Sequence, residues 1–169
     1  AAATDFTIGI EEEFQILDPE TLDLVQRFEE LRDAAEATDP PLGESITGEL
    51  IASAIEIRSG KGATFADAVV QQQDARDRLF RLASNHGVRL GATGTHPWSP
   101  WQEQRIIDTP HYRRNDELLR YVVWRNNTFG LHLHVAINGP DRAIAVMAGL
   151  RNFLPELLAL SASSPLRWS

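Results

Sequence analysis

The chain has 169 residues, enough for one domain with a buried core, and its 43% hydrophobic and 24% charged residues are typical of a globular protein. Its formal net charge of −8 argues against nucleic acid or an anionic membrane as the main partner, because both repel a negative surface. The lack of cysteine excludes disulfides, thiolate metal sites and a cysteine nucleophile, and it agrees with a cytoplasmic location. We find no stretch approaching the ~20 apolar residues of a membrane span and no signal-peptide pattern at the N-terminus.

The first predicted element is a strand over residues 6–16 whose polar face is strongly acidic. Because successive side chains of a strand point to opposite faces, Glu11 and Glu13 share the polar face, and Glu12 falls on the apolar face, where we expect a structural role. The apolar face carries Phe6, Ile8, Ile10, Phe14 and Ile16. Carboxylates about 7 Å apart repel each other unless a cation or a hydrogen-bond donor lies between them. A plain solvated sheet face is the alternative interpretation.

The next segment predicts a hairpin, a helix and a second strand. Residues 22–25 read as a short return strand, and a helix over residues 26–37 ends before Pro40 and Pro41. The second half of residues 44–60 is a predicted strand. On it Ile55 and Ile57 fall on one face, with Glu56 and Arg58 on the other.

The middle of the chain predicts two helices around a strand and a loop. A helix follows the N-cap Thr64 and stops at Gly87, and a strand over residues 88–95 has Val88, Leu90 and Ala92 pointing inward. Residues 96–108 are rich in Pro and Trp without a period, so they form a loop, and a helix runs from Thr109 to about Asn126.

The last two predicted elements are an alternating strand and an apolar helix. In "FGLHLHVAI", residues 129–137, the apolar side chains face the core, while His132 and His134 occupy the other face. The helix covers residues 140–161 with a kink at Pro155. This order of elements predicts a single α+β domain over residues 1–169 with a largely antiparallel sheet and flanking helices.

Three predicted strands each offer a polar face, and together these faces predict a metal site. If one sheet aligns them, carboxylate oxygens gather beside imidazoles, a set that suits Mg²⁺ or Mn²⁺ and its usual companion ATP. The chain has no GxxxxGK[ST] or GxGxxG loop, so an ATP site would act through metals and side chains. Zinc on His132 and His134 is an alternative, and a histidine pair without a ligand is another.

Five ordered motifs carry a resemblance to a known family. "GIEEEF", "GELIASAIEIRSG", "GATGTHPW", "TFGLHLHV" and "LRNFLPELLALSASSP" resemble, in this order and spacing, the carboxylate–amine ligases related to bacterial glutamate–cysteine ligase. The resemblance runs from Phe6 to Pro165. It implies a glutamine-synthetase-like antiparallel sheet and an ATP- and Mg²⁺-dependent enzyme. Such an enzyme phosphorylates the carboxylate of a glutamate-like acid and lets an amine displace the phosphate.

The resemblance also implies roles for individual residues of the polar faces. Those similar to the family's metal ligands are Glu11, Glu13, Glu49 and Glu56. His132 resembles the family's histidine that contacts the substrate or the transferred phosphate, and His134 resembles a nucleotide-binding group more weakly. Arg58 and Ser59 follow the Glu56 strand and are expected to meet an anionic substrate or the nucleotide, with Arg58 and His132 as the catalytic residues. Glu49 and Glu56 are seven residues apart, so a bend near residues 52–54 must bring both to one face.

The resemblance covers only about half of a family member. The chain is therefore either a fragment or a natural short form, and a half sheet would leave an open edge and an exposed apolar face. We expect a homo-oligomer or a partner chain that supplies the missing half, with small-molecule substrates. The alternative to an active ligase is a non-catalytic, ligase-like module that acts by association.

Overall fold

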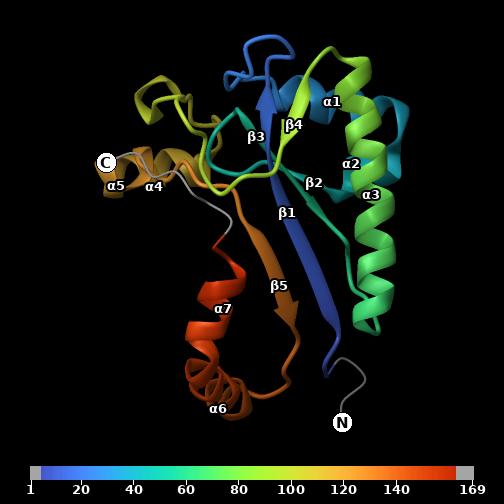
Figure 1. The fold of residues 1–169 in the computed structure, drawn as a ribbon, viewed down its shortest axis with the longest axis vertical. Helices are drawn as coiled ribbons and strands as arrows, with labels where there is room; N and C mark the ends of the chain where they lie inside the picture. Colours follow the sequence, from blue (N-terminus) through green and yellow to red (C-terminus); the bar gives the residue numbers. More distant parts are fainter. Residues whose placement is uncertain (1–4, 163–169) are drawn as a thin grey trace.

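The computed structural model describes residues 5–162 as an α+β fold, an open antiparallel sheet with flanking helices (Figure 1), which confirms the predicted class. In chain order the elements are β1 (Ile8–Leu17), α1 (Phe28–Thr38), α2 (Pro40–Ser45), β2 (Ile46–Thr47), β3 (Ala54–Arg58), α3 (Phe65–Asn85), β4 (Arg89–Gly91), the 3₁₀ turn η1 (Trp101–Glu103), α4 (Pro110–Leu119), α5 (Tyr121–Trp124), β5 (Leu131–Val135), α6 (Pro140–Leu150), the 3₁₀ turn η2 (Arg151–Phe153) and α7 (Leu154–Leu160). The last three residues of the family resemblance, 163–165, lie outside the described residues.

Strand β1 is the centre of the sheet, and its register aligns the polar faces of its neighbours. On one side β1 pairs with β3, which in turn pairs with β2. The other edge of β1 is shared, with β4 at its C-terminal end and β5 along its N-terminal half. Glu13 lies opposite Glu56, while Glu11 lies opposite Arg58 on one side and His132 on the other. Directly opposed residues of a sheet share a face, so the predicted polar faces form one surface.

Helices α1, α2 and α3 cover the other face of the sheet and form the main core with it. Phe14, Ile16, Ile55 and Ile57 are fully buried against these helices, as the alternation predicted. Helix α3 begins at the predicted N-cap Thr64, which forms a capping box with Asp67, and is followed by Gly87 with φ of +67°.

The charge of Glu12 on this apolar face is compensated by helix α3. Its carboxylate accepts hydrogen bonds from Gln72, at 3.0 Å, and from Arg76, at 3.1 Å. The Arg76 guanidinium also lies over the rings of Phe14 and Phe80. Glu12 therefore ties β1 to α3, which is the structural role that its position predicted.

Several predicted boundaries differ from the structure. The return strand is a single bridge between Leu17 and Leu24, because Leu22 adopts a left-handed φ of +61° that interrupts an extended run. Pro40 and Pro41 begin the short helix α2 as well as ending α1, since proline is tolerated in a first helical turn and Asp39 caps it. The strand predicted over residues 88–95 covers only Arg89–Gly91.

The predicted helix over residues 109–126 is broken into α4 and α5. Arg120 has a φ of +42°, which is incompatible with a right-handed helix, so the helix axis is interrupted there. The loop prediction for residues 96–108 holds apart from η1. Within this loop the buried His96 is structural, because its Nδ1 accepts from the Ser99 amide at 3.0 Å and its Nε2 lies 2.8 Å from the Leu22 carbonyl.

The predicted core face of β5 is exposed in the described chain, so that prediction was wrong about burial although right about alternation. Leu131 is 65% exposed and Leu133 is 60% exposed. The reason is position: β5 pairs with residues 8–12 of β1, and in Figure 1 β5 and α6–α7 lie on the other side of β1 from α1, α2 and α3. We call the exposed side chains of this region the β5–α7 apolar surface: Leu131, Leu133, Val135, Ile144, Val146, Met147, Leu150, Phe153, Leu154, Leu157, Leu158 and Leu160.

One helical run, Pro140–Leu160, is long and apolar enough to cross a membrane by length and composition, which corrects the statement that no stretch approaches such a span. The sequence reading passed over this run because the charged residues Arg151 and Glu156 lie inside it. Length and composition do not distinguish a membrane span from the core helix of a larger fold, and a single candidate is weak evidence.

Candidate functional site

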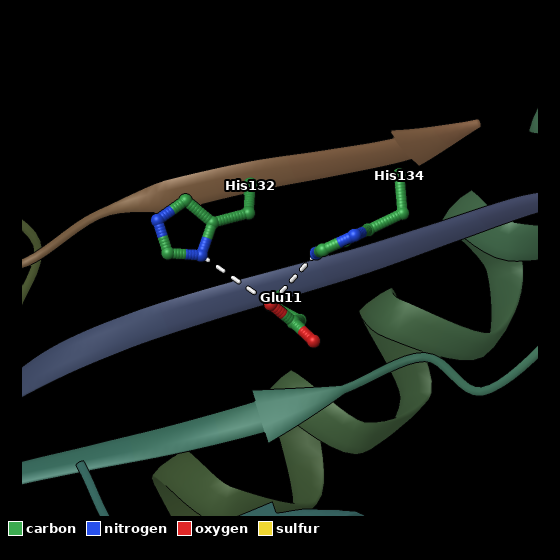
Figure 2. Close-up of side chains that lie close together, drawn as sticks. All are labelled: Glu11, His132 and His134. Carbon is green, nitrogen blue, oxygen red and sulfur yellow. Dashed lines mark hydrogen bonds and ion pairs between the residues drawn. The ribbon is translucent and has the colours of Figure 1, made fainter. Parts of the chain in front are cut away.

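Glu11, His132 and His134 form the centre of the polar surface (Figure 2). The Glu11 Oε2 atom lies 2.8 Å from Nε2 of His134 and 3.3 Å from Nδ1 of His132. This arrangement follows from the strands, because His132 lies opposite Glu11 on the neighbouring strand and His134 lies two residues further on the same face. One ligand atom from each residue lies within 4.8 Å of the others, so the three side chains can bind one metal ion.

Glu13, Glu56 and His132 form a second group of the same kind. One ligand atom from each again lies within 4.8 Å of the others, and His132 belongs to both groups. Glu13 Oε2 accepts a hydrogen bond of 2.8 Å from the backbone amide of Gly130, which fixes the carboxylate beside the start of β5. A Cβ atom at Gly130 would lie 2.8 Å from Nε2 of His132, so a larger residue there would push the exposed His132 ring from its place in the cluster. We call the side chains of Glu11, Glu13, Glu49, Glu56, His132 and His134 the carboxylate–histidine cluster.

The electrostatics of this cluster show an excess of negative charge at β3. Burial, a hydrogen bond with Glu49 and the charges of Glu49, Glu11 and Glu13 together raise the pKa of Glu56 to about 8. Burial also raises the pKa of Glu13 above its usual value, and the charges of Glu49 and Glu11 add to the rise. Burial and the negative charges of Glu49, Glu56 and Glu13 raise the pKa of the neighbouring Tyr112 to about 12.

Glu11 behaves differently because the histidines compensate it. Partial burial alone would raise the pKa of Glu11, but the hydrogen bonds and charges of His134 and His132 outweigh it and lower that pKa. The cluster therefore has a compensated end at Glu11 and an uncompensated end at Glu13, Glu56 and Glu49.

The structure confirms the bend that the Glu49–Glu56 spacing required. The chain turns at Ala52 and Ser53, where the Ala54 amide donates to the Ile51 carbonyl at 3.0 Å. This turn separates Glu49 from β3 and brings its carboxyl group within hydrogen-bonding reach of Glu56. The four carboxylates predicted as metal ligands thus lie in one region of the polar surface.

Arg58 and Ser59, which follow each other in the sequence, point to different surroundings. Arg58 is exposed on the face of Glu11 and Glu56, and its guanidinium forms no ion pair with the described residues. Ser59 is turned to the backbone instead: its Oγ accepts from the Ile10 amide at 3.0 Å and donates to the Gly60 carbonyl at 2.8 Å. The structure therefore brings Arg58 to the cluster and gives Ser59 a structural hydrogen bond, while the predicted nucleotide contact of Ser59 stays a prediction.

The cluster fits a divalent cation by its donor chemistry. A buried carboxyl that keeps its proton to about pH 8, surrounded by further carboxylates, is a site where a positive charge would relieve repulsion. Carboxylate oxygens are preferred by Mg²⁺ and Mn²⁺, and the imidazoles of His132 and His134 are ligands that Mn²⁺ or Zn²⁺ also accept.

Two groups at the cluster were missed from the sequence. The first is the Gly130 amide, which binds Glu13, and the only hint of it in the sequence is the glycine itself, directly before "LHLHV". The second is Tyr112, whose hydroxyl donates to the Gly48 carbonyl at 2.8 Å. No sequence pattern indicates this contact, because it depends on how α4 folds back toward β3.

Comparisons with known proteins agree with the resemblance. The model of "Glutamate-cysteine ligase family 2(GCS2)" matches residues 7–168. The chain belongs to glutamate–cysteine ligase family 2. Similar curated relatives include "Putative glutamate--cysteine ligase 2-3" of Rubrobacter xylanophilus, 37% identical over 97% of this chain and 45% of the relative. Others are proteins named "Putative glutamate--cysteine ligase 2" from Solibacter usitatus, 39% identical over 94% of this chain and 41% of the relative, and from Bordetella avium, 35% identical over 95% and 40%.

The chain thus spans less than half the length of these relatives. All the elements of the carboxylate–histidine cluster lie within the part that the family model matches.

Proposed function

We propose that the chain supplies the metal-binding half of an ATP-dependent carboxylate–amine ligase, which joins a glutamate-like acid to an amine through an acyl phosphate. The observation that carries this proposal is the convergence of carboxylates and imidazoles from β1, β3 and β5 on one surface. Family membership supports the ligase class. Mg²⁺ or Mn²⁺ bound there would neutralise the charge of the transferring phosphoryl group.

The residues of the cluster have distinct proposed roles. Glu11, Glu13, Glu49 and Glu56 hold the cations, with the Gly130 amide fixing the orientation of Glu13. His132, which touches both metal-binding groups, donates a hydrogen bond to substrate or to the transferred phosphoryl oxygens. Arg58 offers a forked guanidinium to an anionic substrate or phosphate on the same face.

The activity of the complete enzyme also needs the part of the family that this chain does not span. The β5–α7 apolar surface adjoins the cluster through β5, so we propose that this surface contacts the remaining half of the ligase, from the same or another polypeptide. In that assembly α6 and α7 are core helices and not a membrane span.

Calorimetric titration with ATP in the presence of Mg²⁺ tests the proposal on the chain as it is. We expect Mg²⁺-dependent binding that Glu11→Gln and Glu13→Gln each weaken by roughly tenfold, because each removes one charge from the ligand set. Without metal, the free energy of unfolding should hold or rise in Glu13→Gln, which relieves carboxylate repulsion, and should fall slightly in Glu11→Gln, which loses the charge that pairs with His132 and His134.

Glu12→Gln is the matched control, because Glu12 has the same charge and strand but faces α3. It should lower stability slightly and leave nucleotide affinity unchanged. Equal losses of nucleotide affinity in all three variants, or no Mg²⁺-dependent binding by the unmodified chain, would remove the basis of the proposal.

The competing function is a non-catalytic, ligase-like module that acts by binding another chain. The exposed β5–α7 apolar surface favours this function, because such a surface can bind another chain without any catalysis. It predicts association without ligation. ATP-dependent coupling of glutamate to an amine, assayed after adding the second half of a relative, separates the two functions. Coupling supports the ligase, and a stable but inactive assembly supports the module.

A further inference from the structure

Glu49 lies in the segment between β2 and β3, whereas the other five members of the carboxylate–histidine cluster lie on strands. Strand pairing fixes the direction of those five side chains, but it does not fix the direction of Glu49. The carboxyl group of Glu49 nevertheless reaches Glu56, with which it shares a hydrogen bond. Contacts other than strand pairing must therefore hold the backbone of Glu49 in place.

The two carbonyl groups that flank Glu49 are both bound by the stretch of chain that leads into α4. The Gly48 carbonyl accepts a hydrogen bond of 2.8 Å from the Tyr112 hydroxyl. The Leu50 carbonyl accepts one of 2.9 Å from the Ile107 amide. The peptide groups before and after Glu49 are thus held at two points, and the direction of its side chain is held with them.

The backbone at Gly48 also packs closely against the main core. A Cβ atom at Gly48 would lie 2.7 Å from ring carbons of Phe28, which is 2% exposed and belongs to that core. The Gly48 peptide therefore contacts α1 through the Phe28 ring and α4 through the Tyr112 hydroxyl. A segment without regular secondary structure is in this way tied to two helices.

Tyr112 is itself fixed in place. Its ring packs against the main core and against the smaller apolar cluster around Ile51 and Phe129. Its amide donates to Oγ1 of Thr109, the N-cap of α4, at 3.2 Å. Burial and the charges of the nearby carboxylates, Glu49 first among them, raise the pKa of Tyr112 to about 12, so the hydroxyl keeps the proton that it donates.

We infer that Tyr112 is a positioning residue of the proposed ligase: its hydroxyl holds the Gly48 carbonyl so that Glu49 can bind the cation that Glu56 also binds. Tyr112 acts through Glu49 and does not touch the cation in this role. The inference rests on the proposed function, because Glu49 is a metal ligand only in that function. Groups that orient a metal ligand commonly change the affinity of the site for its metal.

Binding of Mn²⁺ to the chain, measured from the loss of the free-ion signal in electron paramagnetic resonance, tests the inference. Tyr112→Phe keeps the ring and its packing and removes only the hydroxyl. The variant should bind Mn²⁺ about two- to tenfold more weakly, the effect of losing one hydrogen bond.

Tyr121→Phe is the matched control, because Tyr121 lies on the neighbouring helix α5 and its hydroxyl accepts from Arg125. It should leave Mn²⁺ affinity unchanged. Unchanged affinity in Tyr112→Phe, or an equal loss in Tyr121→Phe, would overturn the assignment.

A double-variant cycle separates positioning of Glu49 from a general loss of structure. Glu49→Gln should weaken Mn²⁺ binding roughly tenfold, because it removes one charge from the ligand set. Adding Tyr112→Phe to Glu49→Gln should weaken binding by no more than about twofold further, since the carboxylate that Tyr112 positions is already gone. A merely structural Tyr112 would cause the same loss with and without the Glu49 carboxylate, and that result would contradict the inference.

Amide hydrogen exchange of Ile107 gives a reading that needs no metal. Exchange in metal-free Tyr112→Phe should be faster than in the unmodified chain and in Tyr121→Phe, because the contacts around Glu49 loosen. Equal exchange in all three proteins would contradict the inference. Mn²⁺ binding that Glu13→Gln weakens and Tyr112→Phe does not would overturn the role of Tyr112 alone, whereas no Mn²⁺ binding by the unmodified chain would overturn the proposed function as well.

Discussion

Glu56 is the most deeply buried carboxyl of the described cluster, and other carboxylates surround it. It is 3% exposed, lies opposite Glu13 in the β1–β3 pair and shares a hydrogen bond with Glu49. Burial is the main reason that its pKa rises to about 8, and the hydrogen bond with Glu49 and the charges of Glu49, Glu11 and Glu13 add to the rise. A protein keeps such a group at a cost in stability, and a bound cation is the usual compensation.

The raised pKa of Glu56 predicts how stability depends on pH in metal-free protein. The unfolded carboxyl titrates near its ordinary pKa of 4.5, so between that pH and about 8 the folded state binds more protons than the unfolded state. The free energy of unfolding must then fall as pH rises through this window, by on the order of a few kcal/mol. Urea denaturation at several pH values between 5 and 8.5 measures this slope.

Glu56→Gln provides the comparison, because the amide resembles the protonated carboxyl at every pH. The variant should lose the downward slope and be more stable than the unmodified chain at about pH 8. Mg²⁺ should reduce the slope of the unmodified chain only. An identical slope in both proteins would show that Glu56 does not carry the excess charge.

At the scale of secondary-structure elements, alternation predicted which side chains share a face but not which faces are covered. For β1 and β3 the apolar face is also the covered face, because α1–α3 pack on the side that carries Phe14 and Ile55. For β5 they differ: the alternation of Leu131 and His132 is real, but Leu131 is exposed in the described chain. Burial depends on what packs against a face, and a strand pattern contains no information about that.

In the candidate site, too, the sequence predicted which side chains share a face but not which strands and loops bring them together. Parity placed Glu11, Glu13 and Glu56 on polar faces, and the seven-residue spacing of Glu49 and Glu56 required a bend that the structure contains at Ala52 and Ser53. Register between strands was not predictable, because Glu11 meets His132 only through pairing across more than a hundred residues. The turn of Ser59 to the backbone and the approach of Tyr112 likewise depend on tertiary packing.

The different coverage of β3 and β5 gives a prediction for two substitutions. Ile55→Ala should cost about 2–5 kcal/mol of stability, because it leaves a cavity in the core formed with α1–α3. At protein concentrations low enough for the chain to be monomeric, Leu131→Ala should change the stability by less than about 0.5 kcal/mol, because its side chain then faces solvent. Urea denaturation of both variants checks this. A core-sized loss in Leu131→Ala would mean that β5 is covered in solution by a second molecule.

At the scale of the whole molecule, the β5–α7 apolar surface is the dominant feature. In the described chain its twelve side chains lie on β5, α6, η2 and α7, elements in which no residue is buried. Monomeric proteins rarely expose so many large apolar side chains in one region. Curated relatives are more than twice as long as the matched segment, and we propose that residues beyond that segment cover this surface in the family.

Without that cover, two copies of the chain should bury the surface against each other. We expect sedimentation velocity to show reversible, concentration-dependent self-association of the chain. Leu133→Glu combined with Leu157→Glu should shift the equilibrium toward monomer, because a charge on each of two elements opposes burial of the surface. Val70→Glu, a comparable exposed position on α3, should leave the equilibrium unchanged.

In the proposed ligase assembly the β5–α7 apolar surface contacts the second half, so it cannot serve self-association at the same time. Adding the polypeptide that follows the matched segment in the Rubrobacter relative should therefore shift the chain from self-associated species to a defined complex, and the Leu133→Glu, Leu157→Glu variant should form neither. Sedimentation velocity with the partner labelled distinguishes the two species. A complex that forms alongside undiminished self-association would show that the partner binds elsewhere, and β5 would then be an edge used between copies of this chain.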